Sequence, residues 1–162
     1  MRKGNNNKKA EIEGFMALPD GRPTVVLADD HDDVLRRVKE ILANEFNVVA
    51  AVSNGTEIAQ ATLKHKPDIL VLDISMPGLD GIQAAREIRR LALSAKLIFL
   101  TVQEDSDYVH AARGLEASYV LKRRMHIDLP LAMQEALAGR LFVSPLSVLT
   151  SPGADSGKRG IK

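Results

Sequence analysis

Residues 67–81 read PDILVLDISMPGLDG, a short apolar run that ends in an acidic residue and a turn. The run from 69 to 72 is continuous in apolar side chains, as expected of a parallel strand covered on both faces. Asp73 follows it directly. The turn at 76–78 contains a proline, which fixes φ, and a glycine, which tolerates unusual dihedral angles. The stretch predicts a buried strand that delivers one carboxylate to a rigid loop.

Strands and helices alternate on both sides of this stretch. Short apolar runs recur along the chain, and segments with helical periodicity separate them. Five such units indicate an α/β protein with an open, doubly wound parallel sheet, right-handed crossovers and helices on both faces. Gly114 is expected to cap the end of the fourth helix and Asp128 the start of the fifth. The expected strands are residues 24–28, 48–52, 69–72, 97–100 and 118–121, and the expected helices begin near 32 and span about 55–65, 80–92, 105–113 and 128–139.

The composition excludes several classes of protein. The 162 residues include 22 Lys and Arg against 21 Asp and Glu, and only 4% are aromatic. Direct nucleic-acid binding is therefore not expected, because the chain has neither a large basic field nor a stacking platform. Without cysteine there is no disulfide framework and no thiolate metal site. No apolar run approaches the ~20 residues of a spanning helix, so we expect no membrane partner and a cytoplasmic location.

The two ends of the chain differ from its middle. Residues 1–22 and 144–162 are rich in Asn, Lys, Gly and Ser and have little apolar surface, so both are expected to be disordered. Met16 is an alternative start of the protein. A single folded domain is expected over residues 23–143.

Chemically active side chains follow four of the predicted strands. Asp29 and Asp30 follow the first strand, Asp73 the third, Thr101 the fourth and Lys122 the fifth. The carboxyl ends of parallel strands meet at one edge of a sheet, where such folds bind ligands. Any one of these residues alone is usually an ordinary loop residue, but carboxylates gathered this closely repel one another unless a cation holds them. Mg²⁺ is the expected ion because it prefers hard oxygen ligands.

Together these residues resemble the receiver domain of two-component response regulators. The matching stretches are VLADDH at 26–31, residues 67–81, the pair Leu100 and Thr101, and YVLK at 119–122. The resemblance covers residues 23–143. It implies the flavodoxin-like receiver fold, with strand order 2-1-3-4-5.

The resemblance also implies a phosphoryl-transfer site. Asp73 accepts a phosphoryl group from a sensor histidine kinase or phosphotransfer protein. Asp29, Asp30 and Asp73, with the backbone carbonyl of Ser75, hold Mg²⁺. The protein is then a phosphoacceptor signalling protein with autophosphatase activity, not an enzyme.

Three further residues are assigned to the switch by the same resemblance. Thr101 and Lys122 bind the phosphoryl oxygens, and Tyr119 is the aromatic side chain that responds. The face made by the fourth helix, fifth strand and fifth helix changes shape, signals to a partner protein and is the family's usual surface for a homodimer. By its residues alone, Tyr119 is a half-buried strand aromatic.

The chain departs from the family pattern at three places. Arg123 stands where many receivers have a proline, and Val102 is bulkier than the usual alanine or glycine. Val102 is predicted to narrow access to the phosphoryl group and to slow its hydrolysis. Residues 133–145 resemble the end of NarL/LuxR-type receivers, which a helix-turn-helix output domain normally follows. Seventeen residues remain after Pro145, too few for that domain, so the chain is expected to be a stand-alone receiver or a truncated transcription regulator.

Two other functions remain open. A pseudo-receiver would keep the fold and act only as a protein-binding module. A haloacid-dehalogenase-type phosphohydrolase also uses an aspartate nucleophile and Mg²⁺, but it needs a second Asp where this chain has Ser75. The histidines at 31, 65, 110 and 126 lack ligand spacing and are expected on the surface, with His31 near the metal but not bound to it.

Overall fold

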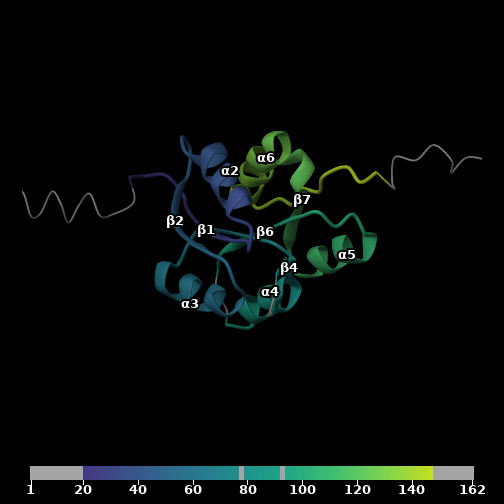
Figure 1. Cartoon of the computed structure of the whole chain (residues 1–162), viewed down its shortest axis with the longest axis horizontal. Coiled ribbons are helices and arrows are strands. Elements are labelled where there is room, and N and C mark those ends of the chain that lie inside the picture. Colours follow the sequence, from purple (N-terminus) through teal and green to yellow (C-terminus); the bar gives the residue numbers. More distant parts are fainter. Residues whose placement is uncertain (1–19, 77–78, 92–93, 148–162) are drawn as a thin grey trace, which may run out of the picture.

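The computed structural model of the chain describes residues 20–76, 79–91 and 94–147. A parallel sheet of five strands forms its centre, in the order β2-β1-β3-β6-β7 (Figure 1). Since β6 and β7 are the fourth and fifth parallel strands along the chain, the predicted order 2-1-3-4-5 is confirmed. The strands are β1 (Thr24–Ala28), β2 (Asn47–Val52), β3 (Ile69–Leu72), β6 (Lys96–Thr101) and β7 (Ala117–Leu121).

Helices cover both faces of this sheet, as Figure 1 shows. Helices α2 (Asp32–Leu42) and α6 (Met125–Leu137) lie on one face. On the other face lie α3 (Thr56–His65), α4 (Gly81–Arg90) and α5 (Ser106–Gly114). The five helices expected from the hydrophobic periodicity are all present, with ends that differ from the expected ones. Within the described residues, none of them has both the length and the apolar character needed to cross a bilayer.

The strand residues alternate between two hydrophobic cores. In β1, Val26 and Ala28 belong to the core under α3, α4 and α5, whereas Val25 and Leu27 belong to the core under α2 and α6. Successive side chains of a strand point to opposite faces, so a strand that is apolar at every position needs cover on both sides. The continuous apolar runs of the sequence are explained by this arrangement.

Two predicted helix caps are wrong. Gly114 is the last residue of α5, and the cap is Leu115, whose N–H bonds back into the helix. The left-handed residue that turns the chain toward β7 is Glu116, with φ of 55°. Asp128 lies inside α6, which begins at Met125 after the 3₁₀ turn η1 (Lys122–Arg124). The helix starts earlier because Met125 is buried in the core and because an ion pair between Arg124 and Asp128 holds its first turn.

The described chain continues past residue 143, the predicted end of the folded domain. Residues 142–144 run beside β7: the N–H of Tyr119 donates to Phe142 O at 2.8 Å, and the N–H of Ser144 donates to Tyr119 O at 2.8 Å. Leu146 is buried. At the other end, Arg22 donates to the carbonyl oxygen of Ala43. The remainder of both predicted disordered ends, residues 1–19 and 148–162, lies outside the described residues.

Candidate functional site

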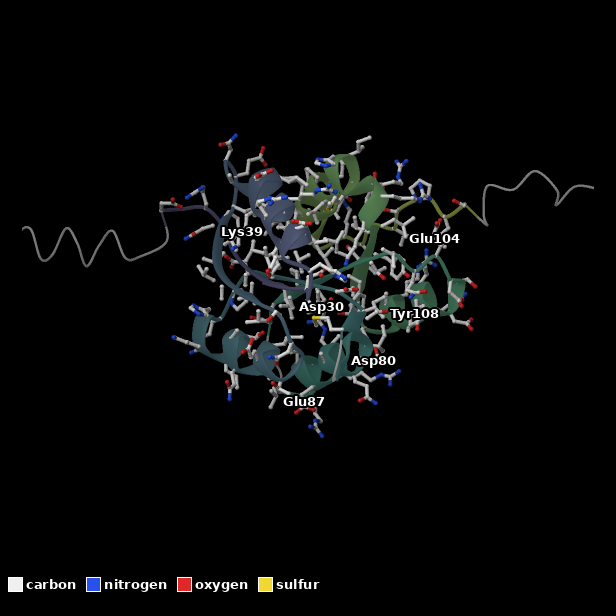
Figure 2. The ribbon with its side chains drawn as sticks, viewed as in Figure 1. Asp30, Lys39, Asp80, Glu87, Glu104 and Tyr108 are labelled. Carbon is white, nitrogen blue, oxygen red and sulfur yellow. The ribbon has the colours of Figure 1, made fainter. Side chains whose placement is uncertain are left out.

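The carboxyl edge of the sheet brings the predicted site residues together, near the label of Asp30 in Figure 2. Asp29 and Asp73 follow β1 and β3, and Lys122 follows β7. Lys122 Nζ lies 2.7 Å from Asp29 Oδ2 and 3.1 Å from Asp73 Oδ2. Thr101 is the last residue of β6. The structure therefore confirms that side chains separated by up to 93 positions meet at this edge, as the strand-end argument requires.

Backbone contacts hold Asp73 in place. Its N–H donates to Ala28 O at 2.9 Å, and the N–H of Gly81 donates to Ile74 O at 2.8 Å. The loop after Asp73 contains a short antiparallel pair, β4 (Ser75–Met76) and β5 (Leu79–Asp80), which the sequence did not predict. A Cβ atom at Gly81 would stand 2.4 Å from the carbonyl oxygen of Asp73, so only glycine allows helix α4 to begin this close to the site.

The charges at this edge are not balanced. Asp29, Asp30 and Asp73 face one ammonium group, that of Lys122, among the described residues. Burial raises the pKa of Asp73, and the charge of Asp29 adds to this, while Ser75 N–H and Lys122 act against it. Burial alone would lower the pKa of Lys122, but the two carboxylates outweigh it and raise that pKa. Lys122 is therefore held as a cation and the site keeps an excess of negative charge.

Two buried oxygens of the site have one nitrogen neighbour each and no hydrogen bond of good geometry. Asp29 Oδ2 lies 2.7 Å from Lys122 Nζ, and Asp30 Oδ1 lies 3.1 Å from His31 Nδ1. Buried carboxylate oxygens with so few donors are costly unless a cation binds them. One ligand atom from each of Asp29, Asp30, His31 and Asp73 lies within 4.8 Å of the others. These oxygens fit a hard divalent cation such as Mg²⁺.

Ser75 and His31 border the acidic cluster. The N–H of Ser75 donates to Asp73 Oδ1 at 3.1 Å, so this residue lies directly beside the carboxylate, and its carbonyl oxygen stays a predicted ligand. The Nδ1 atom of His31 lies 3.1 Å from Asp29 Oδ1 and 3.1 Å from Asp30 Oδ1, and its side chain is 63% exposed. His31 is thus at the surface and near the cluster, as predicted.

Thr101 and Tyr119 both bond to the backbone of one residue, Gln103, in the loop after β6. Thr101 Oγ1 accepts a hydrogen bond from Gln103 N at 3.1 Å, and the Tyr119 hydroxyl donates to Gln103 O at 2.7 Å. Both side chains are fully buried, so the expectation of a half-buried Tyr119 is wrong. Burial raises the pKa of Tyr119 and keeps its hydroxyl a donor. Sequence reasoning missed Gln103 because its backbone makes both contacts, and a backbone role leaves no signal in the residue type.

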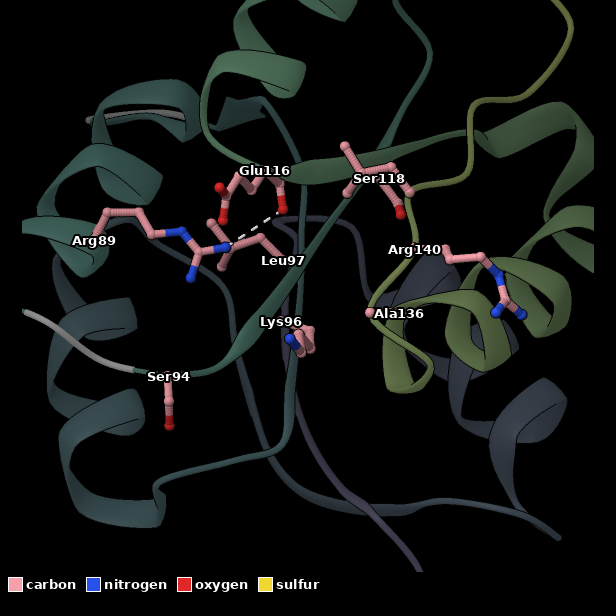
Figure 3. Close-up of a pocket in the computed structure, with 10 residues that line it drawn as sticks. Arg89, Ser94, Lys96, Leu97, Glu116, Ser118, Ala136 and Arg140 are labelled. Carbon is pink, nitrogen blue, oxygen red and sulfur yellow. Dashed lines mark hydrogen bonds between the residues drawn. The ribbon is translucent and has the colours of Figure 1, made fainter.

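A cavity of about 360 Å³ lies elsewhere, at the amino ends of β6 and β7 (Figure 3). Its lining includes Arg89 and Arg140. Arg89 donates to the carbonyl oxygens of Ala95 and Leu115, and Arg140 pairs with Glu135. Both guanidinium groups already have partners, and Glu116 is the one acidic residue that lines this cavity, so it has no counterpart of the buried carboxylate cluster, and the acidic edge is the candidate site.

The chain is similar in sequence to known proteins. Residues 25–133 match the response regulator receiver domain. The chain is 34% identical over 123 residues to the oxygen regulatory protein NreC of Staphylococcus haemolyticus, covering 74% of this chain and 57% of that protein. It therefore spans a little over half the length of the curated relatives that it matches.

Solved structures of receivers superpose on the chain. A two-component response regulator of the LuxR family from Aurantimonas has a TM-score of 0.72 and 30% identity, covering 77% of this chain and 91% of that one. The receiver domain of the putative regulator NarL from Mycobacterium tuberculosis has a TM-score of 0.69 and 27% identity, covering 74% and 98%. The chain belongs to the response regulator receiver family, the signalling proteins of two-component systems.

Proposed function

We propose that Asp73 accepts a phosphoryl group from a sensor histidine kinase or phosphotransfer protein in a Mg²⁺-dependent reaction. The observation that carries this proposal is the placement of a buried carboxylate, with a raised pKa, beside Lys122 and two further carboxylates. Such an excess of charge is expected where a site must bind a cation during its chemistry. A structural carboxylate would have enough donors to balance it.

The chain's own residues orient the nucleophile. One oxygen of Asp73 accepts from Ser75 N–H and the other from Lys122 Nζ, which fixes the carboxylate plane. A carboxylate oxygen bonds to phosphorus as the phosphorus–nitrogen bond of phosphohistidine breaks, and the imidazole of the donor keeps the electron pair. Bound Mg²⁺, held by Asp29, Asp30, Asp73 and the Ser75 carbonyl, would neutralise charge on the phosphoryl oxygens. Lys122 would bind one of these oxygens in place of a carboxylate.

The bonds around Gln103 supply a route from the site to the surface. Thr101 Oγ1 uses a lone pair for Gln103 N–H, so its own proton is available for a phosphoryl oxygen. Turning Thr101 toward that oxygen would release the N–H of Gln103 and loosen this residue, whose carbonyl oxygen accepts the hydrogen bond from Tyr119. To shift such an equilibrium from 1:99 to 99:1 requires about 5.5 kcal/mol of differential interaction.

The partners follow from this role. The face of α5, β7 and α6 would signal to a downstream protein and could pair two copies of the chain in a homodimer. A phosphoacceptor of this kind would work in the cytoplasm and lose its phosphoryl group by autophosphatase activity. The alternative is a pseudo-receiver that only binds proteins; the unbalanced charge of the site favours the phosphoacceptor.

Intact-mass spectrometry after incubation with acetyl phosphate and Mg²⁺ tests the proposal. We expect a gain of one phosphoryl group that is lost in Asp73→Asn and with a chelator. The matched control is Asp33→Asn, because Asp33 is an exposed aspartate outside the acidic cluster and should leave the gain unchanged. A folded protein that gains no phosphoryl group, from acetyl phosphate or from a phosphorylated kinase, would support the pseudo-receiver.

A further inference from the structure

Residues 142–147, which we call the C-terminal strap, begin at Phe142, which is hydrogen-bonded to β7, and are anchored to the domain at two further points. At the first anchor, Ser144 is buried: its N–H donates to Tyr119 O at 2.8 Å, and its hydroxyl donates to Asp128 Oδ2 at 2.6 Å. Its Oγ also accepts from Leu121 N at 3.1 Å. These bonds join the strap to β7 and α6 and do not involve the loop after β6.

The second anchor is a latch formed by Glu104, Arg123 and Ser147. Glu104 Oε1 accepts from Ser147 N at 3.0 Å and from Arg123 Nη2 at 3.0 Å. Arg123 Nη2 also donates to Ser147 Oγ at 3.1 Å. The hydrogen bonds from Arg123 and Ser147 lower the pKa of Glu104 to about 2, so the carboxylate stays ionised in the latch. The latch thus joins the loop after β6, the turn after β7 and the strap.

Both domain residues of the latch are next to residues of the phosphoryl site. Glu104 follows Gln103, whose backbone N–H bonds to Thr101 and whose carbonyl oxygen bonds to Tyr119. Arg123 follows Lys122, which pairs with Asp73. A hydrogen bond of 3.0 Å is lost when its atoms separate by about 0.5 Å or more. A small movement of either loop is therefore enough to open the latch.

The strap covers apolar surface between these anchors. Leu146 is 1% exposed and belongs to the core cluster that also contains Tyr119 and Val109, from β7 and α5. In its described position the strap occupies part of the α5–β7 surface with its own leucine. Opening the latch would allow Leu146 to leave the core cluster, and this would expose an apolar surface to which a partner protein could bind.

We propose that the strap is a built-in cover of the α5–β7 surface, and that phosphorylation of Asp73 opens the latch and loosens residues 145–147. This inference rests on the proposed function, because the loop movement is driven by the phosphoryl group. The first anchor at Ser144 stays closed, since none of its three partners lies in the loop after β6. Arg123, which stands where many receivers have a proline, supplies the hydrogen bonds to Glu104 and Ser147 that hold the latch closed.

Hydrogen–deuterium exchange of the full chain, followed by mass spectrometry, tests the latch without phosphorylation. Glu104→Gln removes the charge at the latch and should raise exchange at the Leu146 and Ser147 amides about three- to fivefold. The control is Glu87→Gln, because Glu87 forms a comparable exposed pair with Arg90 on α4, far from the strap. Equal exchange in the two variants would overturn the latch.

The same measurement on protein treated with acetyl phosphate and Mg²⁺ tests the coupling. We expect faster exchange at Leu146 and Ser147 in the phosphorylated protein, unchanged exchange at Leu121 and Ser144, and no response in Asp73→Asn. Phosphorylated protein, verified by its intact mass, with no change at Leu146 and Ser147 would overturn the coupling alone. A folded protein that gains no mass from acetyl phosphate or from a phosphorylated kinase would overturn the proposed function and the coupling with it.

Discussion

Asp73 and Asp128 are equally buried aspartates with opposite electrostatic surroundings. They are 3% and 2% exposed. Burial raises the pKa of Asp73, and its donors do not compensate. Burial would also raise the pKa of Asp128, but hydrogen bonds from Arg124 and Ser144 outweigh it, and the pKa is lowered.

The difference lies in the number of partners for each charge. Asp128 has Arg124 on both oxygens and the Ser144 hydroxyl in addition. Asp73 shares a single lysine with Asp29. A buried carboxylate that is fully paired stabilises the fold, whereas one whose donors do not offset its burial is available for binding and chemistry. Burial alone does not distinguish these two roles.

The largest expected effect is that of Asp128→Ala. Removing this carboxylate leaves Ser144 without its buried acceptor and Arg124 without its partner, so the free energy of unfolding should fall by about 3 kcal/mol. Urea unfolding measures it. Asp33→Ala, at an exposed aspartate of α2, should change the stability by less than about 0.5 kcal/mol. Equal stability of the two variants would contradict the structural role of Asp128.

The next effect is that of Gly81→Ala, which acts on the backbone of Asp73. The added Cβ would stand 2.4 Å from Asp73 O, so we expect a loss of about 2 kcal/mol in stability and slower phosphorylation by acetyl phosphate. Gly114→Ala is the control, because a Cβ there meets nothing within 4 Å. A Gly81→Ala protein that is phosphorylated at the normal rate would show that the site tolerates displacement of this strand end.

Asp73→Asn should have the opposite effect. In the absence of Mg²⁺, it should raise the free energy of unfolding. The folded-state pKa of Asp73 is raised, so its ionised form destabilises the fold. The loss of stability caused by the ionised carboxylate is largest above the folded-state pKa of Asp73. It becomes smaller as the pH falls and is absent below the ordinary pKa of 3.8. Thermal unfolding from pH 3 to 7 should show a gain only at the higher pH values.

Mg²⁺ should offset part of the destabilisation that the ionised Asp73 carboxylate causes. At ten times its dissociation constant, a cation that binds only the folded state stabilises it by about 1.4 kcal/mol. The wild-type protein should gain this stability, and Asp73→Asn should gain less at the same Mg²⁺ concentration. Equal gains would mean that Asp73 is not among the ligands.

The smallest expected effect is that of Val102→Ala. Val102 is 68% exposed, so its stability contribution is small, and the variant should unfold at the same urea concentration as the wild type. Loss of the phosphoryl group from Asp73 should become roughly threefold faster, a barrier change of about 0.6 kcal/mol. Ile127→Ala, at a similarly exposed residue on α6, is the control. An unchanged dephosphorylation rate would reject the hypothesis that Val102 restricts access.

Much of the fold and of the candidate site could be predicted because the signals are local. Apolar runs and helical periodicity report on neighbouring residues, and they were sufficient for the five parallel strands and for Asp29, Asp73, Thr101 and Lys122 at their ends. The cap at Asp128 was wrong for the same reason. An aspartate before Leu-Pro has the local pattern of a cap, and its partner Ser144 is 16 positions away.

The sequence by itself determined the strands, the helices and the set of residues at the carboxyl edge, because period-2 and period-3.6 patterns follow from backbone geometry. The strand order followed from the resemblance to receiver domains. Only the tertiary structure decided which charges are balanced, that the backbone of Gln103 joins Thr101 to Tyr119, and that residues 142–147 cover β7. These properties depend on distances between atoms that are remote in sequence. A pKa, a buried ion pair and a latch arise only when folding brings such groups within a few ångströms and removes the water between them.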